Sequence, residues 1–277
     1  MAGPLTRRRP AGRLAAGYAS RLAGRLTERD RRIALDCYDH RLLTTEQIRR
    51  LHFATLRVAQ RRLSDLYELR VLDRFRPVWQ RGDGSTPYHW VLDHAGALVV
   101  SELLDLPVDQ LTWRRDHAHA LAASSKREHQ LAVNEFFTRL AHDARTAGGS
   151  LAEWWGERRT AAAFASRLQP DGYGRLQLNN NTIPFLLELD RGTETHGRLR
   201  EKALRYAREL PRAELTQTQP LVLLLTPSRE RTAAAADSVG GSGVRIDAAT
   251  WTPDSDQSPL ELLLKLAGKS VPPPSSD

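Results

Sequence analysis

Two kinds of apolar spacing follow one another along this chain of 277 residues. Up to about residue 70, apolar residues recur every three or four positions, a spacing that predicts helices. One helix is expected after Thr27, which is followed by first-turn acids, and a second, shorter one after Thr44. A third is expected across "TLRVAQRRLSDLYELRVLDRF", with Leu63 and Leu66 among its inward positions.

The period then changes to one that is typical of strands. "VLDRFRPVWQ" and "YHWVL" predict two strands around the Gly-rich turn "RGDGSTP". Three helices followed by a β-hairpin is the element order of a winged helix, in which the third helix enters the major groove of DNA. Arg57, Gln60 and Arg61 lie on the polar side of that helix and are expected to face base edges. Arg76 and Arg81 on the hairpin are expected near phosphates.

A winged helix can also serve contacts between proteins. Asp65 and Glu68 dilute the positive face of the third helix, so the sequence favours DNA without excluding a protein partner. The next segment, "DHAGALVVSELLDLPVDQL", predicts a helix with a Leu-rich face. We expect it to be a packing or dimerisation element, and a homodimer is one assembly that it allows.

Beyond about residue 115, helices and strands alternate. "HQLAVNEFFTRLAHDAR" predicts an amphipathic helix, and "GRLREKALRYAREL" and "SRERTAAAADSVG" predict two more. "LAEWWGERR", "GRLQLNNNTIPFLLELD" and "QPLVLLLTP" predict strands, and "GVRIDAATW" a short edge strand. The expected fold class is therefore α+β or α/β in two domains, with an N-terminal winged helix and a C-terminal mixed sheet flanked by helices.

Four segments are expected along the chain. A basic, disordered arm spans 1–25, the winged helix 26–115, the sheet domain 116–266, and a disordered, Pro- and Ser-rich tail 267–277.

The balance of charge points to an anionic partner. Lys and Arg number 41 against 33 Asp and Glu, a net charge of +8, which favours nucleic acid or an anionic surface. An Arg-rich proteome would produce the same excess with no partner at all. The single cysteine, Cys37, lies in an apolar run and is expected in the core, which fits a cytoplasmic location. No apolar run approaches the roughly 20 residues that span a bilayer, so no membrane contact is expected.

Three acids come together in the expected sheet. Glu188 and Asp190 end the strand "PFLLELD", and residues two apart on a strand face the same side. Asp171 lies in the turn "LQPDGYG" that leads into the preceding strand, so we expect the three carboxylates to converge. Such oxygens suit Mg²⁺ or Mn²⁺, which would activate a water and stabilise charge on a phosphate.

This pattern resembles the PD-(D/E)xK nuclease superfamily, whose fold is restriction-endonuclease-like. More specifically, "LQPDG", "FLLELDRGTE" and "KALRYA" behind a winged helix resemble the replication-relaxation family of actinobacterial and plasmid-borne proteins, over roughly residues 26–225. The resemblance implies a protein that binds double-stranded DNA and assists plasmid relaxation, replication or transfer. A relaxase or replication protein is the implied protein partner.

The chain departs from the superfamily at one motif position. The last motif residue is a Lys that orients or deprotonates the attacking water, and here Asp190 stands in its place. Lys202 on the following helix is the candidate substitute, because a long ammonium side chain reaches across several Å. Asp190 could instead pair with Arg191 or cap the "RGT" turn.

Two functions therefore stay open. In the first, the protein is a Mg²⁺- or Mn²⁺-dependent DNA endonuclease or nickase that uses Asp171, Glu188, Asp190 and Lys202, the three acids as metal ligands. In the second, it is a non-catalytic DNA-binding accessory factor or transcriptional regulator with a degenerate nuclease fold.

Overall fold

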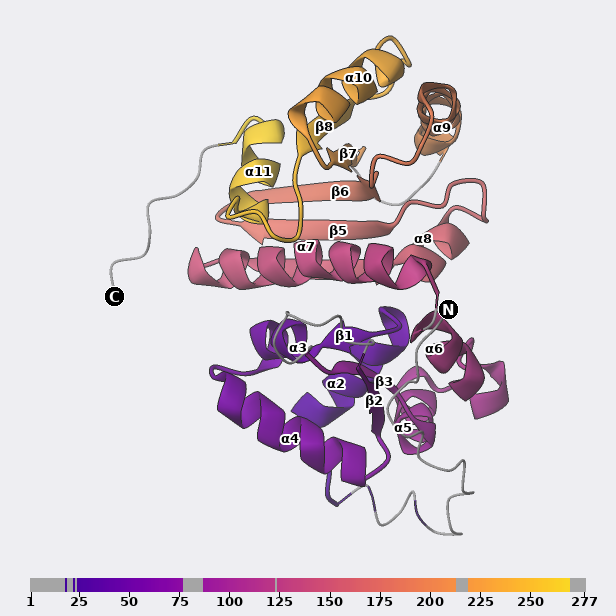
Figure 1. Cartoon of the computed structure of the whole chain (residues 1–277), viewed down its shortest axis with the longest axis vertical. Helices are drawn as coiled ribbons and strands as arrows, with labels where there is room; N and C mark the ends of the chain where they lie inside the picture. The colour runs from indigo at the N-terminus through magenta and orange to yellow at the C-terminus, as the bar shows by residue number, and fades with distance from the viewer. Residues whose placement is uncertain are drawn as a thin grey trace, which may run out of the picture. The chain divides into compact units, whose positions relative to one another are not determined.

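The structure is a computed structural model that describes residues 18, 22, 24–76, 87–122, 124–212 and 219–269 (Figure 1). The chain divides into two compact units, residues 1–131 and 132–277. The expected arm, 1–25, and tail, 267–277, lie for the most part outside the described residues, and so do the turn of the expected hairpin and Arg81. None of the described helices is long and apolar enough to cross a membrane.

Unit 1 consists of helices around a small antiparallel sheet. In chain order it contains α2 (Glu28–Asp39), β1 (Leu43–Thr44), α3 (Thr45–His52), α4 (Leu56–Glu68), β2 (Leu72–Phe75), β3 (His89–Leu92), α5 (His94–Leu104), the 3₁₀ turn η1 (Val108–Gln110), α6 (Arg115–Ala122) and the start of α7 (Lys126–Thr146). The strand order is β1-β3-β2, and both pairs are antiparallel. The expected helices and strands are present, and β1 is an additional strand too short to show any period.

Local side-chain chemistry explains where the first helices begin. Thr27 and Thr44 each accept a hydrogen bond from the backbone N–H three residues further on. Asp30 and Gln47 return the bond by accepting from the backbone N–H of the capping threonine, so both helices start with a capping box. The two threonines singled out in the sequence are therefore confirmed as N-caps.

Residues 116–131 pack with unit 1, although the sequence placed a boundary ahead of them. Leu121 on α6 and Leu131 on α7 pack against a core cluster that contains Leu42, Phe75 and Val91. Since these apolar contacts join α6 and the first turns of α7 to the small sheet, the division of the chain falls at Leu131.

Unit 2 is a five-stranded mixed sheet with helices on both faces. After α7 come β4 (Ser150–Gly156), α8 (Glu157–Ala163), β5 (Gly172–Leu178), β6 (Asn181–Leu189), α9 (His196–Glu209), the 3₁₀ turn η2 (Leu210–Arg212), β7 (Leu221–Thr226), α10 (Arg229–Val239), β8 (Ile246–Thr250) and α11 (Pro259–Leu266). The strand order is β4-β5-β6-β7-β8; β4, β5 and β6 run antiparallel, and β6, β7 and β8 run parallel. The expected mixed sheet, with β8 at an edge, is confirmed.

Two helices of unit 2 were not predicted. The signal for α11 was present, because Ser258 caps the helix and Pro259 occupies its first turn ahead of an apolar run. The signal for α8 is weak, because this helix has seven residues and Gly156 at its N-cap offers no side-chain bond.

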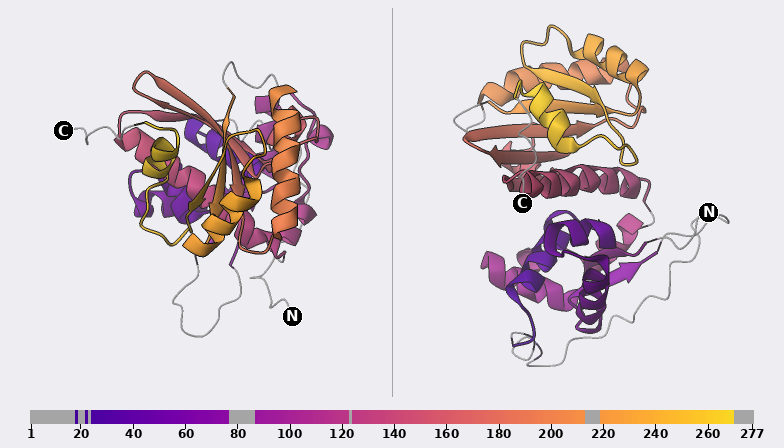
Figure 2. Two further views of the ribbon diagram at one scale, coloured as in Figure 1. Left: turned by 90° about the horizontal axis from the view of Figure 1, so that it is seen from above. Right: turned by 90° about the vertical axis from the view of Figure 1, so that its left-hand side faces the viewer.

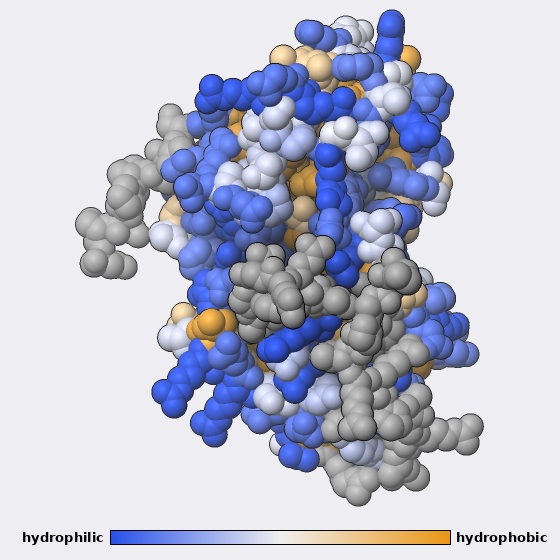
Figure 3. All heavy atoms as spheres, in the orientation of Figure 1, coloured by the Kyte–Doolittle hydropathy of each residue, from blue (hydrophilic) through white to orange (hydrophobic). Residues whose placement is uncertain are grey.

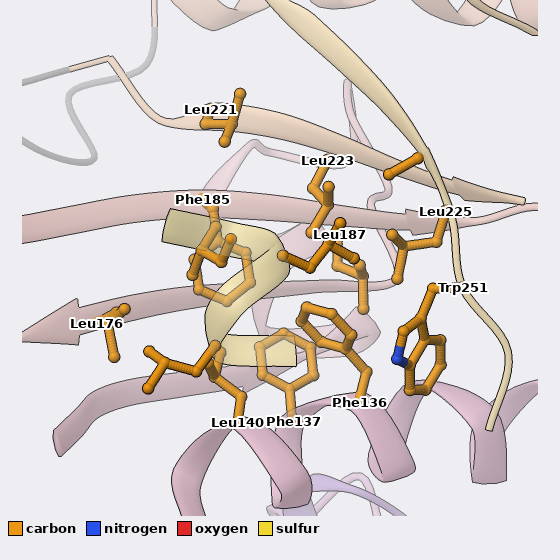
Figure 4. Close-up of a cluster of buried hydrophobic side chains, with 14 of the residues drawn as sticks. Phe136, Phe137, Leu140, Leu176, Phe185, Leu187, Leu221, Leu223, Leu225 and Trp251 are labelled. Carbon is orange, nitrogen blue, oxygen red and sulfur yellow. The ribbon is translucent and has the colours of Figure 1, made fainter. Parts of the chain in front are cut away.

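The two faces of the sheet have different coverings. Phe185, Leu187 and Leu223 point toward α7 and α11 and form the main core (Figure 4). Leu186 and Val222, which alternate with them, pack beneath α9 on the opposite face. Figures 1 and 2 show α7 on one side of the sheet and α9 and α10 on the other.

Two glycines on β5 allow the aromatic core to approach the backbone. A Cβ on Gly174 would lie closer to the rings of Phe185 and Phe137 than real Cβ contacts allow, and one on Gly172 would meet Phe137 at 2.7 Å. Phe137 stacks on Phe185 with ring centroids 5.6 Å apart, so the rings that would have to move hold each other in place. The strand therefore needs glycine at these two positions.

Gly174→Ala is expected to lower the free energy of unfolding by about 1–3 kcal/mol, the usual cost of overpacking a core. Urea unfolding followed by tryptophan fluorescence measures it. Gly197→Ala is the matched control, because a Cβ at Gly197 on α9 meets nothing within 4 Å. Equal unfolding midpoints for the two variants would contradict the close approach at Gly174.

Candidate functional site

Glu188 lies buried near the end of β6, on the face of the sheet that α9 covers. The start of β5 brings Asp171 to the same place: its backbone N–H donates to the Leu187 carbonyl (3.0 Å), and its Oδ2 accepts from the Leu189 N–H (2.8 Å). Asp171 is therefore hydrogen-bonded to the residues directly before and after Glu188 in β6. The two carboxylates repel each other. The structure thus brings together two of the three acids that the sequence singled out.

Helix α9 supplies both side chains that bind Glu188. Lys202 Nζ donates to Glu188 Oε2 (2.9 Å), and Tyr206 Oη donates to Glu188 Oε1 (2.5 Å). Lys202 and Tyr206 are four residues apart, so they share one side of the helix. Lys202 therefore reaches Glu188 from the helix, and its role as the substitute for a motif lysine stays a prediction.

Burial sets the ionisation of this group. Loss of water raises the pKa of Glu188 to about 7; the charge of Lys202 opposes the shift and that of Asp171 adds to it. Burial alone would lower the pKa of Lys202, but the Glu188 carboxylate and the hydrogen bonds to Glu194 and Glu188 raise it. Burial, followed by the charge of Glu188, raises the pKa of Tyr206 well above its usual value. At neutral pH Lys202 is a charged donor, and Tyr206 keeps its proton.

Glu194 is a member of the site that the sequence did not reveal. Its Oε1 accepts from Lys202 Nζ (2.9 Å), so the ammonium lies between two carboxylates. Its Oε2 is buried with no hydrogen-bond partner among the described residues. Glu194 lies in the loop between β6 and α9, where no periodic pattern orients side chains, so only its position in "ELDRGTE" gave any signal.

Asp190 is engaged in different contacts from those of Glu188. Its Oδ1 accepts from the backbone N–H of Gly192 (2.8 Å), so it caps the turn after β6, one of the two alternatives that the sequence left open. Its Oδ2 accepts from Arg231 Nε of α10 (2.6 Å), and Arg231 also donates to the Glu194 carbonyl. The role of Asp190 as a metal ligand stays a prediction.

The expected divalent metal would have few protein ligands here. Among the residues that the structure describes, no three His, Cys, Asp or Glu side chains are placed to hold one ion together. Mg²⁺ usually keeps several waters and needs only one or two carboxylates, and Asp171 and Glu188 as its ligands stay a prediction. The mutual repulsion of these two acids and the unbonded Glu194 Oε2 are what a cation nearby would relieve.

A small pocket adjoins this group between α9, α10 and the sheet. Glu188, Lys202 and Tyr206 line one part of it, and the rest is apolar: Leu199, Ala203, Val222, Leu224, Val239 and Ile246. Apolar walls strengthen the electrostatic interactions beside them, because little water screens the charges.

Unit 1 presents the basic residues that the sequence assigned to DNA. Arg57, Gln60 and Arg61 are exposed on α4. The Arg76 guanidinium lies over the Tyr88 ring, 3.8 Å from its centroid. Arg81 lies outside the described residues.

Arg74 on β2 was not singled out in the sequence, yet it joins α4 to the small sheet. Its guanidinium lies 4.5 Å from the Tyr67 ring centroid, 4.3 Å from that of Tyr88 and 5.6 Å from that of Trp90. Tyr67 is on α4 and Trp90 on β3, so one cation stacks against both elements. Arg74 shares its side of β2 with the buried Leu72, so the alternation of the strand gave no sign of the aromatic rings around it.

Arg231→Met is expected to lower the free energy of unfolding by about 3–5 kcal/mol, because it leaves the buried Asp190 carboxylate without its cation. Urea unfolding measures it. Arg245→Met is the control, since Arg245 pairs with Asp247 with 62% of its side chain exposed, and such a pair contributes about 0.2–1 kcal/mol. A cost for Arg231→Met no larger than that of the control would contradict the buried pair.

Comparison with known proteins places the chain in a family. A family model described as Replication-relaxation matches residues 36–219, which include the α4 surface, Asp171, Glu188 and α9. No curated protein and no solved structure matches the chain. Because the match covers well over half of the sequence and both sets of candidate residues, the chain belongs to the replication-relaxation family.

Proposed function

We propose that this protein binds double-stranded DNA of a bacterial plasmid or mobile element and acts on it, in the cytoplasm, during replication, relaxation or transfer. We further propose that unit 2 nicks or cuts the DNA with the help of a divalent metal. The observation that carries the proposal is the meeting of Lys202 with Glu188 beside Asp171. A metal-binding acid pair and a charged donor are the parts that such chemistry needs.

The order of elements in unit 2 supports a restriction-endonuclease-like domain. Helix α7, the antiparallel strands β4, β5 and β6, helix α9 and the parallel strand β7 follow in the order expected from the PD-(D/E)xK resemblance. Asp171 precedes the second of these strands, and Glu188 lies near the end of the third. The remaining elements, α8, α10, β8 and α11, would be additions to this core.

Each residue of the proposed site has a role that its contacts support. Asp171 and Glu188 would hold the metal, which when bound supplies an activated water and positive charge beside the phosphate. Lys202 carries a raised pKa, so it would orient the water or a phosphate oxygen by donating hydrogen bonds rather than by removing a proton. Tyr206 and Glu194 would position Glu188 and Lys202.

The small sheet and helices of unit 1 support a winged helix. The order α2, β1, α3, α4, β2, β3 with the sheet β1-β3-β2 gives two helices joined by a short turn and then two antiparallel strands. Helix α4 would then enter the major groove, where exposed Arg57, Gln60 and Arg61 would meet base edges. Arg76 and Arg81 would lie near phosphates.

Arg57→Ala with Arg61→Ala is expected to weaken DNA binding by at least about tenfold, because each lost contact costs roughly 1–3 kcal/mol. Fluorescence anisotropy with a duplex of about 20 base pairs measures the affinity at several salt concentrations. The charge-matched control is Arg32→Ala with Arg229→Ala; Arg32 lies on α2 with 72% of its side chain exposed. Equal affinities for the two double variants would show that α4 does not make the DNA contact. No binding by the wild type at low salt would contradict the proposal that the protein binds DNA.

Purified protein is expected to nick supercoiled plasmid when Mg²⁺ or Mn²⁺ is present and to stop when EDTA is added. Asp171→Asn, Glu188→Gln and Lys202→Met should each abolish nicking and leave DNA binding intact, because none of them removes an arginine of α4. Agarose gels resolve the supercoiled and nicked forms. Nicking that survives Glu188→Gln would show that another site, or a contaminant, cuts the DNA.

A second function is favoured by the contacts of Asp190. The motif position that is usually Lys is here an acid bonded to Arg231 and to its own turn, and both oxygens of Glu188 are also bonded within the protein. In a non-catalytic factor that binds DNA and recruits a relaxase or replication protein, these acids would serve only to stabilise the fold. DNA binding with no nicking under any metal would establish this second function.

A further inference from the structure

Helix α9 has a second charged surface beside the one that binds Glu188. Lys202 and Tyr206 face the acids, and Leu199 and Ala203 are buried against the sheet. The side next to Lys202 carries a row of arginines, which we call the α9 arginine row: Arg198, Arg205, Arg208 and Arg212, the last in η2. All four are exposed, and Figure 3 shows mostly hydrophilic residues where α9 lies in Figure 1.

The spacing of the row follows the helix. Arg198, Arg205 and Arg212 are seven residues apart, so they lie along one side of the helix about 10 Å from one to the next. Arg198 and Arg205 are four residues before and three after Lys202, which puts them on the edge of the Lys202 surface. A linear polyanion that followed this edge would therefore pass the Glu188 site.

Glu209 holds one end of the row in place. This buried carboxylate accepts from Arg208 Nε (2.7 Å) and Arg212 Nη1 (3.4 Å), and Arg167 Nε lies 3.1 Å from its other oxygen. The three arginine side chains are nevertheless 58–63% exposed. One negative charge fixes three cations and leaves most of their N–H groups facing solvent, which lowers the entropic cost of binding an anion.

Arginines are denser on α9 than on the two helices that follow it in unit 2. Helix α10 has two arginines, Arg229 and Arg231, and the second is used by Asp190. Helix α11 has one basic residue, Lys265, beside the acid Glu261. On α9 the arginines outnumber the acids, and one of those acids, Glu209, serves to position the arginines themselves.

We propose that the α9 arginine row binds the phosphate backbone of DNA, so that unit 2 makes a contact of its own with the strand that reaches the Glu188 site. Guanidinium groups match phosphate oxygens in a bidentate manner, and contacts to phosphates are independent of base sequence. The inference rests on the proposed function, and it adds a second, non-specific contact to the base contacts proposed for α4.

Arg198→Gln with Arg205→Gln tests the row in the full-length protein. Within the described residues the side chains of these two arginines make no ion pair, so the substitutions should leave the fold intact, which thermal unfolding checks. Arg200→Gln with Arg229→Gln is the matched control: it removes the same charge, and Arg200 is exposed on the opposite side of α9. Anisotropy with two duplexes of unrelated sequence, between about 50 and 200 mM salt, gives the affinity and its salt dependence.

The row variant is expected to bind both duplexes about tenfold or more weakly, and its slope of log affinity against log salt should fall by about 2, one unit for each lost phosphate contact. The control variant should keep the wild-type slope. Loss of binding in the Arg57 and Arg61 variant together with a wild-type slope in the row variant would overturn this inference and leave the proposed function standing. An effect equal in the row and control variants would also overturn it, since it would reflect net charge alone.

Discussion

A carboxylate that is withdrawn from water needs partners, and the contacts of Glu188 show how unit 2 meets this constraint. Strand β6 places Glu188 on the face of the sheet that α9 covers. Lys202 and Tyr206, one helical turn apart on α9, donate hydrogen bonds to it. The pKa of Glu188 rises to about 7 because burial outweighs the charge of Lys202. The orientation of Lys202 and its second contact with Glu194 follow from satisfying this group, while Leu199 and Ala203 pack α9 on the sheet.

Much of this arrangement could be predicted from the sequence, because it follows from short-range rules. Alternation along β6 put Glu188 on one face, and Lys202 on the following helix was a candidate because its long side chain could reach that face. The threonine caps of α2 and α3 were readable for the same reason. What could not be predicted depends on contacts between distant segments: Arg231 lies 41 residues after Asp190, and Glu194 lies in a loop without a period. The end of unit 1 likewise depends on a contact between distant segments, because Leu121 and Leu131 pack with Leu42 in one core cluster.

Under the proposed function, the two units would divide the chemistry of DNA recognition between them. Unit 1 offers arginines and a glutamine on an exposed helix face, where side chains can meet base edges. Unit 2 offers a buried acid group with an ordered lysine and, along the same helix, a row of arginines that matches phosphates rather than bases. Asp190, which stands where the proposed nuclease motif would have lysine, is neutralised by Arg231, and α9 places the ammonium of Lys202 against Glu188.

Glu188 and Asp171 are proposed to form a metal site that Lys202 serves, and a titration with metal distinguishes this role from a purely structural one. Mn²⁺ would be titrated calorimetrically into the complex of the protein with a short duplex, for the wild type, for Glu188→Gln and for Asp237→Asn, which changes an exposed acid of α10. We expect one Mn²⁺ per wild-type chain, none in Glu188→Gln, and retained binding in Asp237→Asn. Equal Mn²⁺ binding by wild type and Glu188→Gln, or no binding by the wild type, would contradict the proposed metal site.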